Sequence, residues 1–154
     1  MPFSDTRLLN VLSHTFWFLP NVASSYAMYN LLQQKQNSFY HDYHINVCAG
    51  TKAGIGVDAL EPVQKSMGDP LTAKTITLSC GKLTTGVTVP EWTAVMMLTG
   101  SASTAASGYM QTIFRVQSAG VLDGKQKERC YVFDFAPDRA LNVISAVSYT
   151  HLRA

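Results

Sequence analysis

The sequence has few charged residues and no long apolar run, and each shortage excludes a class of protein. Charged residues make up 14% of the 154 residues and the net charge is only +2, so any nucleic-acid-binding patch must be local. The apolar runs are interrupted well short of the ~20 residues that a membrane helix needs. The N-terminus lacks a basic region followed by a long apolar run, so we expect neither a secretory signal nor a membrane anchor.

Cysteine is also scarce, and its placement bears on the compartment. Cys48, Cys80 and Cys130 are far apart in the sequence. An odd, scattered set is typical of buried thiols in a reducing compartment and not of a disulfide framework. Hydrophobic residues make up 47% of the chain, which favours a folded core over disorder. The sequence therefore predicts a single cytoplasmic domain.

Five short apolar runs carry the fold prediction, and each is nearly continuous instead of alternating. Such runs are typical of a parallel sheet that is covered on both faces. Because helical or polar stretches separate them, we expect a three-layer α/β domain with a mainly parallel sheet flanked by helices. The expected strands are residues 14–19, 44–48, 75–79, 93–98 and 130–135, the expected helices residues 21–35, 60–67, 104–116 and 138–146, and the expected polar loops residues 52–56 and 120–128.

The first predicted helix has the clearest signals. Val22, Tyr26, Tyr29 and Leu32 recur at steps of three and four residues, which predicts one apolar face against the sheet. Asn21 precedes them and can accept hydrogen bonds from the free amides at the helix start.

Gly81 and Lys82 follow an apolar strand and invite comparison with a phosphate-binding loop. Such a loop needs two glycines flanking four residues, then lysine, then serine or threonine. Here Leu83 follows the lysine and Ile76 stands where the first glycine belongs, and no other stretch of the sequence fits. The chain therefore has no phosphate loop of its own.

The same region resembles a different motif. Residues 83–90, LTTGVTVP, are similar to the fifth conserved motif of superfamily-two helicases, and residues 111–115, QTIFR, to the sixth. We call these the motif-five and motif-six segments. In the sixth motif a glutamine and an arginine four residues later share one helix face. Residues 14–20 and 130–139 are similar to the opening and closing parts of the same lobe.

The resemblance covers nearly the whole chain, from residue 14 to about residue 145, and it implies a fold and a function. The chain resembles the second RecA-like lobe of a DEAD/DEAH-type helicase, as in the motor subunit of type III-like restriction enzymes. Such a lobe completes a site in which ATP and Mg²⁺ are bound mainly by a first lobe. The implied partners are that missing N-terminal lobe, DNA, and nuclease or methylase domains or subunits. Alone, the chain is expected to be inactive.

The resemblance also implies a role for individual residues. Arg115 would stabilise charge on the transferring phosphoryl group, and Gln111 would support the γ-phosphate or orient water. Gly86 would let the backbone approach the nucleotide, and Thr88 would stand at its ribose. The implied nucleic-acid contacts are Lys82, Thr84 and Thr85.

Two positions depart from the family pattern, and a third residue could substitute for the missing arginine. Ser118 stands where the sixth motif has a second arginine, and Thr88 stands where the fifth often has aspartate. Either Arg115 acts alone or another basic residue, such as Arg139, substitutes.

Two other constellations suggest chemistry less strongly. The spacing of His41, His44 and Cys48 suggests a zinc site. Structural zinc needs four ligands, and the sequence has no second pair of cysteine or histidine ligands, so no metal site is expected. Asp58, Glu61 and Lys65 suggest a nuclease cluster, but they lack the acid-any-lysine spacing that such a site requires. A charged helix surface is the better interpretation.

Alternative functions are a free-standing ligand-binding module, flavodoxin-like or receiver-like, and a degenerate lobe that only clamps DNA. A receiver needs acidic residues at early strand ends, and a flavin module needs a hydroxyl-rich first loop. Neither is present. Trp17 and Trp92 could stack on bases, but both border strands and are expected in the core.

The ends of the sequence break its pattern. Residues 147–154 do not continue the preceding helix and resemble translated adaptor sequence. We therefore expect residues 1–146 to be a helicase lobe truncated at both ends, followed by a non-native tail.

Overall fold

A computed structural model describes the chain in twelve stretches. These are residues 12–49, 57–68, 73–80, 89–99, 111–114, 116–117, 120–122, 125–127, 129–136, 138, 141 and 144–145. The predicted tail, residues 147–154, and the predicted loop 52–56 lie outside them.

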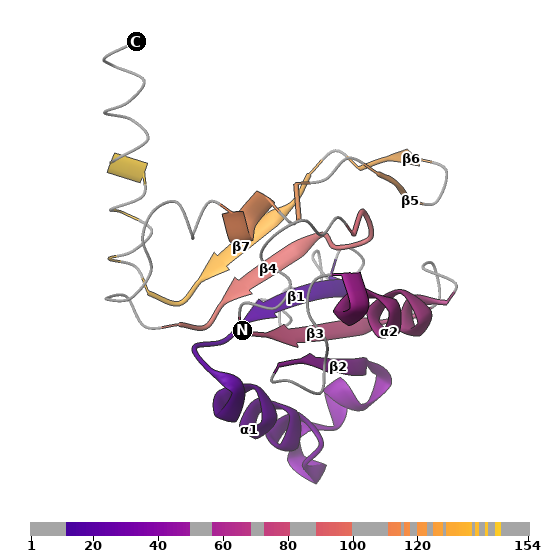
Figure 1. Ribbon diagram of the computed structural model, residues 1–154, viewed down its shortest axis with the longest axis vertical. Coiled ribbons are helices and arrows are strands. Elements are labelled where there is room, and N and C mark those ends of the chain that lie inside the picture. The colour runs from indigo at the N-terminus through magenta and orange to yellow at the C-terminus, as the bar shows by residue number, and fades with distance from the viewer. Residues whose placement is uncertain are drawn as a thin grey trace.

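The centre of the fold is a five-stranded sheet in which every strand pair is parallel. The order is β2-β3-β1-β4-β7 (Figure 1). All five predicted strands are present, two with the predicted bounds and three one or two residues shorter. They are β1 (His14–Phe18), β2 (His44–Cys48), β3 (Thr75–Ser79), β4 (Ala94–Met97) and β7 (Tyr131–Asp134).

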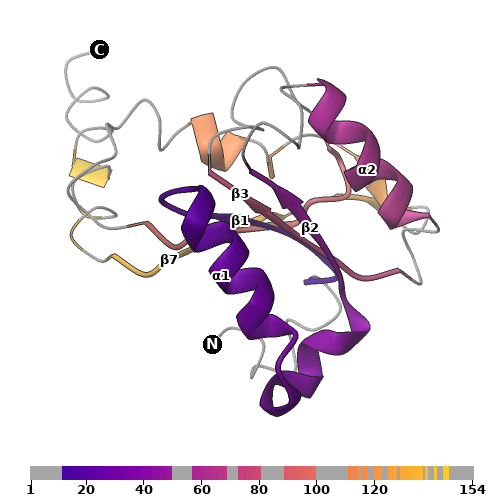
Figure 2. The same cartoon turned by 60° about the horizontal axis from the view of Figure 1, so that its bottom comes forward.

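Helices cover both faces of this sheet, which confirms the three-layer prediction. Figure 2 shows α1 (Val22–Leu32) and α2 (Val57–Met67) on opposite sides of the strands. A buried hydrophobic cluster lies on each side of the sheet. Phe16 belongs to the cluster on the α2 side, and the next residue, Trp17, belongs to the cluster on the α1 side. Alternating side chains of β1 therefore feed two cores, as expected for a buried parallel strand.

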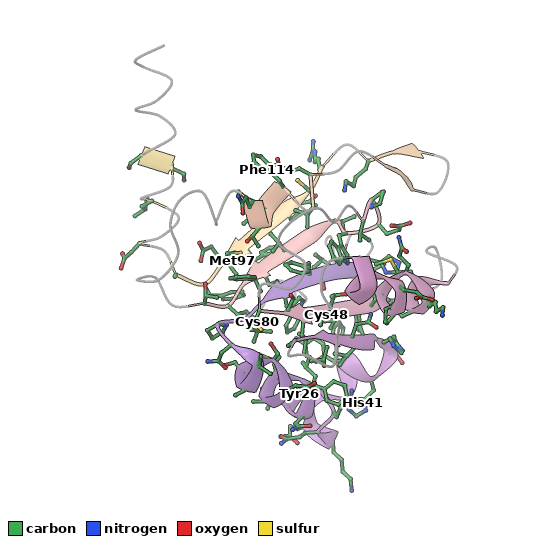
Figure 3. All side chains as sticks on the ribbon, in the orientation of Figure 1. Tyr26, His41, Cys48, Cys80, Met97 and Phe114 are labelled. Carbon is green, nitrogen blue, oxygen red and sulfur yellow. The ribbon has the colours of Figure 1, made fainter. Side chains whose placement is uncertain are left out.

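The start of α1 agrees with the sequence, and so do Tyr29 and Leu32 of its predicted apolar face, which pack in the core. Asn21 Oδ1 accepts a hydrogen bond from the Ser24 amide at 2.7 Å, as predicted for an N-cap. Val22 and Tyr26, however, are 39% and 44% exposed (Figure 3 labels Tyr26). The buried residues of α1 are Ser25 and Leu32.

The other half of the buried face was not predicted, because serine is mostly an exposed residue. The Ser25 hydroxyl donates to the Asn21 carbonyl at 3.1 Å, so burying it leaves no polar group unpaired. Met28 and Tyr29 pack against the same cluster as Leu32. Ser25 and Met28 thus take the places predicted for Val22 and Tyr26 on the face that packs in the core.

The second helix confirms the predicted end but begins earlier. Helix α2 ends at Met67, and Gly68 has a φ of +45°, the left-handed conformation that often follows a helix. Its first residue is Val57, so Pro62 lies inside the helix and not in its first turn.

Three further segments complete the described fold. A 3₁₀ segment, η2 (Lys35–Asp42), follows α1 and was not predicted. The predicted loop 120–128 instead contains an antiparallel pair, β5 (Val121–Leu122) and β6 (Lys125–Gln126). Of the predicted third helix, residues 111–114 are described and helical, and of the fourth, the described residues 138, 141, 144 and 145 are helical.

Trp17 and Trp92 are both fully buried, which confirms that they are core residues. No helix within the described stretches is long and apolar enough to cross a membrane.

The three cysteines are free thiols, and Cys48 is the buried one. Burial raises the pKa of the Cys48 thiol from 9.0 to about 11, because the low-dielectric core disfavours the thiolate. The folded state therefore holds this proton more tightly than the unfolded state does. The stability that this difference contributes is complete below pH 9 and is lost as pH rises toward 11.

The Cys48→Ala variant tests this linkage. At pH 8 it should be less stable than wild type, and by pH 10.5 the gap should shrink by on the order of 1–2 kcal/mol, because only the wild type has the thiol. Urea unfolding at both pH values measures the gap. A gap of constant size would show that the Cys48 thiol is not held neutral by the fold.

Candidate functional site

Seven residues were predicted for the site, and the structure describes one of them. Gln111 lies on the helical turn 111–114, as the sequence predicts. The other six lie outside the described residues: Lys82, Thr84, Thr85, Gly86, Thr88 and Arg115. The site is therefore built from the described residues that flank the two motif segments.

The motif-five segment leaves the carboxyl end of β3 and returns before β4. Cys80, just past β3, is half-buried, and Figure 3 shows it near Met97, at the edge where the strands end. In α/β sheets this edge is where ligands bind. The chain returns at the opposite edge, because β3 and β4 both run parallel to β1. There Val89 is fully buried and accepts a hydrogen bond from the Trp92 amide at 3.2 Å.

The helical turn of the motif-six segment is anchored on one side and exposed on the other. Thr112 and Ile113 are buried, whereas Gln111 is exposed and Phe114 is 52% exposed (Figure 3). The turn ends with the Val116 amide bonded to the Ile113 carbonyl at 3.1 Å. The Gln111 amide group is therefore presented to solvent on a turn whose neighbours are fixed in the core.

One hydrophobic cluster joins the flanks of both segments. Val89 and Trp92 belong to it from the first flank, and Ile113 and Val116 from the second. Phe16 of β1 is also a member, and its ring centroid lies 4.9 Å from that of Trp92. The structure thus brings the two flanks together on the α2 side of the sheet, although more than twenty residues separate them in the sequence.

A lysine from the β5–β6 hairpin reinforces this junction. Lys127 Nζ donates to the carbonyl oxygens of Pro90 at 3.1 Å, Trp92 at 3.0 Å and Val116 at 2.7 Å. Its backbone amide donates to the Gly120 carbonyl at 2.8 Å. We call this arrangement, the Lys127 ammonium and its three carbonyls, the Lys127 clamp.

The charge on Lys127 fits its surroundings. Burial lowers the pKa of Lys127, and Cys130 and Glu91 nearby act to raise it. Only the protonated form has three N–H donors, and three carbonyl acceptors converge on it. Sequence reasoning missed this residue, because a lysine within a polar loop carries no pattern that distinguishes a clamp from a solvated side chain.

The same face of the sheet carries buried polar atoms. Thr77 on β3 is in register with Phe16 and so points to the α2 side, as does Ser79 two residues later. The side-chain oxygens of both, and Trp92 Nε1, are buried without a hydrogen-bond partner in the described structure. Such groups are uncommon in folded cores, and these lie close in sequence to the two ends of the motif-five segment.

The weaker constellations behave as surface or packing features. His41 Nε2 lies 3.1 Å from the Gln34 carbonyl, and the described residues hold no group of three or more potential metal ligands. Glu61 and Lys65 form an ion pair of 2.7 Å with both side chains largely exposed. This confirms a charged helix surface at these two positions.

Comparison with known proteins gives one relationship. The chain is similar to a Mycoplasma pneumoniae protein named as the C-terminus of a proposed type II restriction enzyme and methyltransferase, RM.MpnORF110P, with 33% identity over 138 residues. The match covers 88% of this chain and 19% of that protein, so the chain spans about a fifth of the length of its relative. No protein-family model matches the chain, and no solved structure does.

Gly120 offers a test of the junction. A β-carbon added at this residue would lie 2.6 Å from Pro90 Cβ, so Gly120→Ala should push the hairpin away from Pro90 and destabilise the fold by about 1–3 kcal/mol. Gly68→Ala is the matched control, because nothing lies within 4 Å of its added carbon and its cost is about 1 kcal/mol from backbone strain alone. Urea unfolding measures both. Wild-type stability in Gly120→Ala would contradict the close contact.

Proposed function

We propose that this chain is the second motor lobe of an ATP-dependent DNA helicase or translocase in a restriction or phage-defence system. The observation that carries the proposal is the shared cluster, in which Val89 and Trp92 pack with Ile113 and Val116. Two segments that each resemble a helicase motif are thereby joined at their flanks on one face of a parallel sheet. A lobe that uses both motifs at one site requires such a junction.

The relative supports the biological setting of the proposal. A restriction enzyme and methyltransferase acts on DNA, which favours DNA over RNA as the nucleic acid that this lobe contacts. Because the chain corresponds to about a fifth of that protein, further domains have room to contribute a first lobe, a nuclease or a methylase. These are the partners that we propose.

The chemistry of the lobe is electrostatic. In phosphoryl transfer, negative charge on the equatorial oxygens is stabilised by a positioned cation, and Arg115 is the residue that we propose for this role. Gln111, exposed on the preceding turn, would hold the γ-phosphate or the attacking water. Gly86 and Thr88 would border the nucleotide. On the nucleic acid, Lys82, Thr84 and Thr85 would contact phosphate oxygens.

ATP and Mg²⁺ would be bound mainly by the first lobe, since the sequence has no phosphate loop. The chain by itself is therefore expected to show no ATP hydrolysis above background. Joining it to a first lobe that carries a phosphate loop and an acidic metal-binding motif should produce DNA-stimulated hydrolysis.

Arg115→Ala in that joined protein is the decisive substitution. Loss of an arginine finger costs about 10³–10⁵ in kcat, so hydrolysis should fall by at least a thousandfold while the affinity for DNA changes little. The control is Gln117→Ala, an exposed side chain two residues later, which should leave hydrolysis unchanged.

The outcomes separate the candidate functions. Retained DNA binding with no effect of Arg115→Ala on hydrolysis would identify a lobe that only clamps DNA. Robust hydrolysis by the isolated chain would contradict the proposal altogether.

A further inference from the structure

We propose that Lys127 is a positioning residue for the motor site, whose ammonium group sets the spacing between the motif-five and motif-six segments. The inference rests on the proposed function, and it adds to that function a residue outside both motifs. Lys127 touches neither nucleotide nor nucleic acid in this account. It acts through the backbone of the segments that do.

The contacts of the clamp define what it holds. Two of its acceptors are the carbonyl of Pro90, the last residue of the motif-five segment, and that of Trp92, two residues later. The third is the carbonyl of Val116, which directly follows Arg115 in the sequence. The three distances are between 2.7 and 3.1 Å. One cation therefore fixes the ends of two segments that are far apart in the sequence.

The three-fold match between donors and acceptors explains why lysine stands here. An ammonium has three N–H groups that rotate freely about its stem, whereas a guanidinium presents a flat, rigid fork. Three carbonyls converging on one point suit the ammonium. Because the group is partly buried, water competes less for these hydrogen bonds, which strengthens them.

The backbone of Lys127 is itself held in place. Its amide is bonded to the Gly120 carbonyl, and Gly120 lies so close to Pro90 that a β-carbon would not fit. Figure 1 shows the β5–β6 hairpin beyond the end of the sheet opposite the arrowheads, near the start of β4. The position of Lys127 is therefore tied to Pro90 both through its ammonium group and through its own backbone.

The consequence for catalysis follows from geometry. A misplacement of about 1 Å in a reacting group can cost on the order of 100-fold in rate. Loss of the clamp would free the end of the motif-six segment beside Arg115 and the end of the motif-five segment beside Thr88. Turnover should therefore fall, while binding of ATP, held mainly by the first lobe, should not.

Lys127→Met tests the inference, because it keeps the length of the stem and removes the donors. Arg129→Met is the matched control: Arg129 is an exposed cation two residues away. Lys127→Arg is the conservative variant, which keeps the charge but not the three-fold geometry. If Lys127→Met does not fold, hydrogen exchange and ATP hydrolysis are both measured on Lys127→Arg instead.

The first measurement is hydrogen exchange on the chain itself. The amides of Trp92 and Val116 are bonded to the Val89 and Ile113 carbonyls, in the two turns that Lys127 holds. In Lys127→Met these turns should open more often, so both amides should exchange about tenfold faster. Amides within the sheet, such as those of His44 and Thr75, should be unchanged, as should all amides in Arg129→Met. Unchanged exchange at Trp92 and Val116 would overturn the clamp.

The second measurement is DNA-stimulated ATP hydrolysis by the chain joined to a first lobe. Lys127→Met should lower kcat by about 10- to 100-fold with the KM for ATP within about twofold of wild type, and Lys127→Arg should restore part of kcat. Faster exchange with unchanged kcat would make Lys127 a purely structural residue and overturn the inference. An inactive wild-type protein would instead overturn the proposed function, and the inference with it.

Discussion

The burial of Trp92 against Phe16 is the contact on which the rest of the candidate site depends. Trp92 is fully buried and lies between the end of the motif-five segment and the start of β4. Its ring joins the cluster that contains the motif-six flank, and its carbonyl accepts from Lys127. The hydrophobic contact and the charged clamp therefore act on the same short turn. Each of them links both segments, the cluster through side chains and the clamp through backbone carbonyls.

The fold was largely predictable from the sequence because its strands are continuous apolar runs, and all five were located to within two residues. The N-cap at Asn21 was also predictable, because its signal lies in the residues at the start of the helix itself. The buried face of α1 was predictable only in part: Tyr29 and Leu32 pack in the core, whereas Val22 and Tyr26 are exposed. Val22 and Tyr26 are as apolar as the residues that pack, and the choice depends on Ser25 bonding to the Asn21 carbonyl, a detail that only the packed structure decides.

The candidate site was less predictable, and the reason is again physical. Gln111 was selected because helicase-like spacing is visible along the chain, and its place on a helical turn agrees with the sequence, while its role stays a prediction. Lys127 was missed because its three partners come from two distant segments, and nothing in the sequence around it records them. The motif-derived roles of Arg115 and of residues 82–88 remain a proposal, supported by the packing of their flanks and by the relationship to a restriction enzyme and methyltransferase.

The central claim is that this chain completes a nucleotide site that a first lobe begins, and one binding measurement tests it most directly. ADP with aluminium fluoride mimics the transferring phosphoryl group, and its affinity for a first lobe can be measured with and without this chain. The account predicts at least about tenfold tighter binding when the chain is present, because a cation that acts in the transition state should favour its mimic. Equal affinity with and without the chain would contradict it.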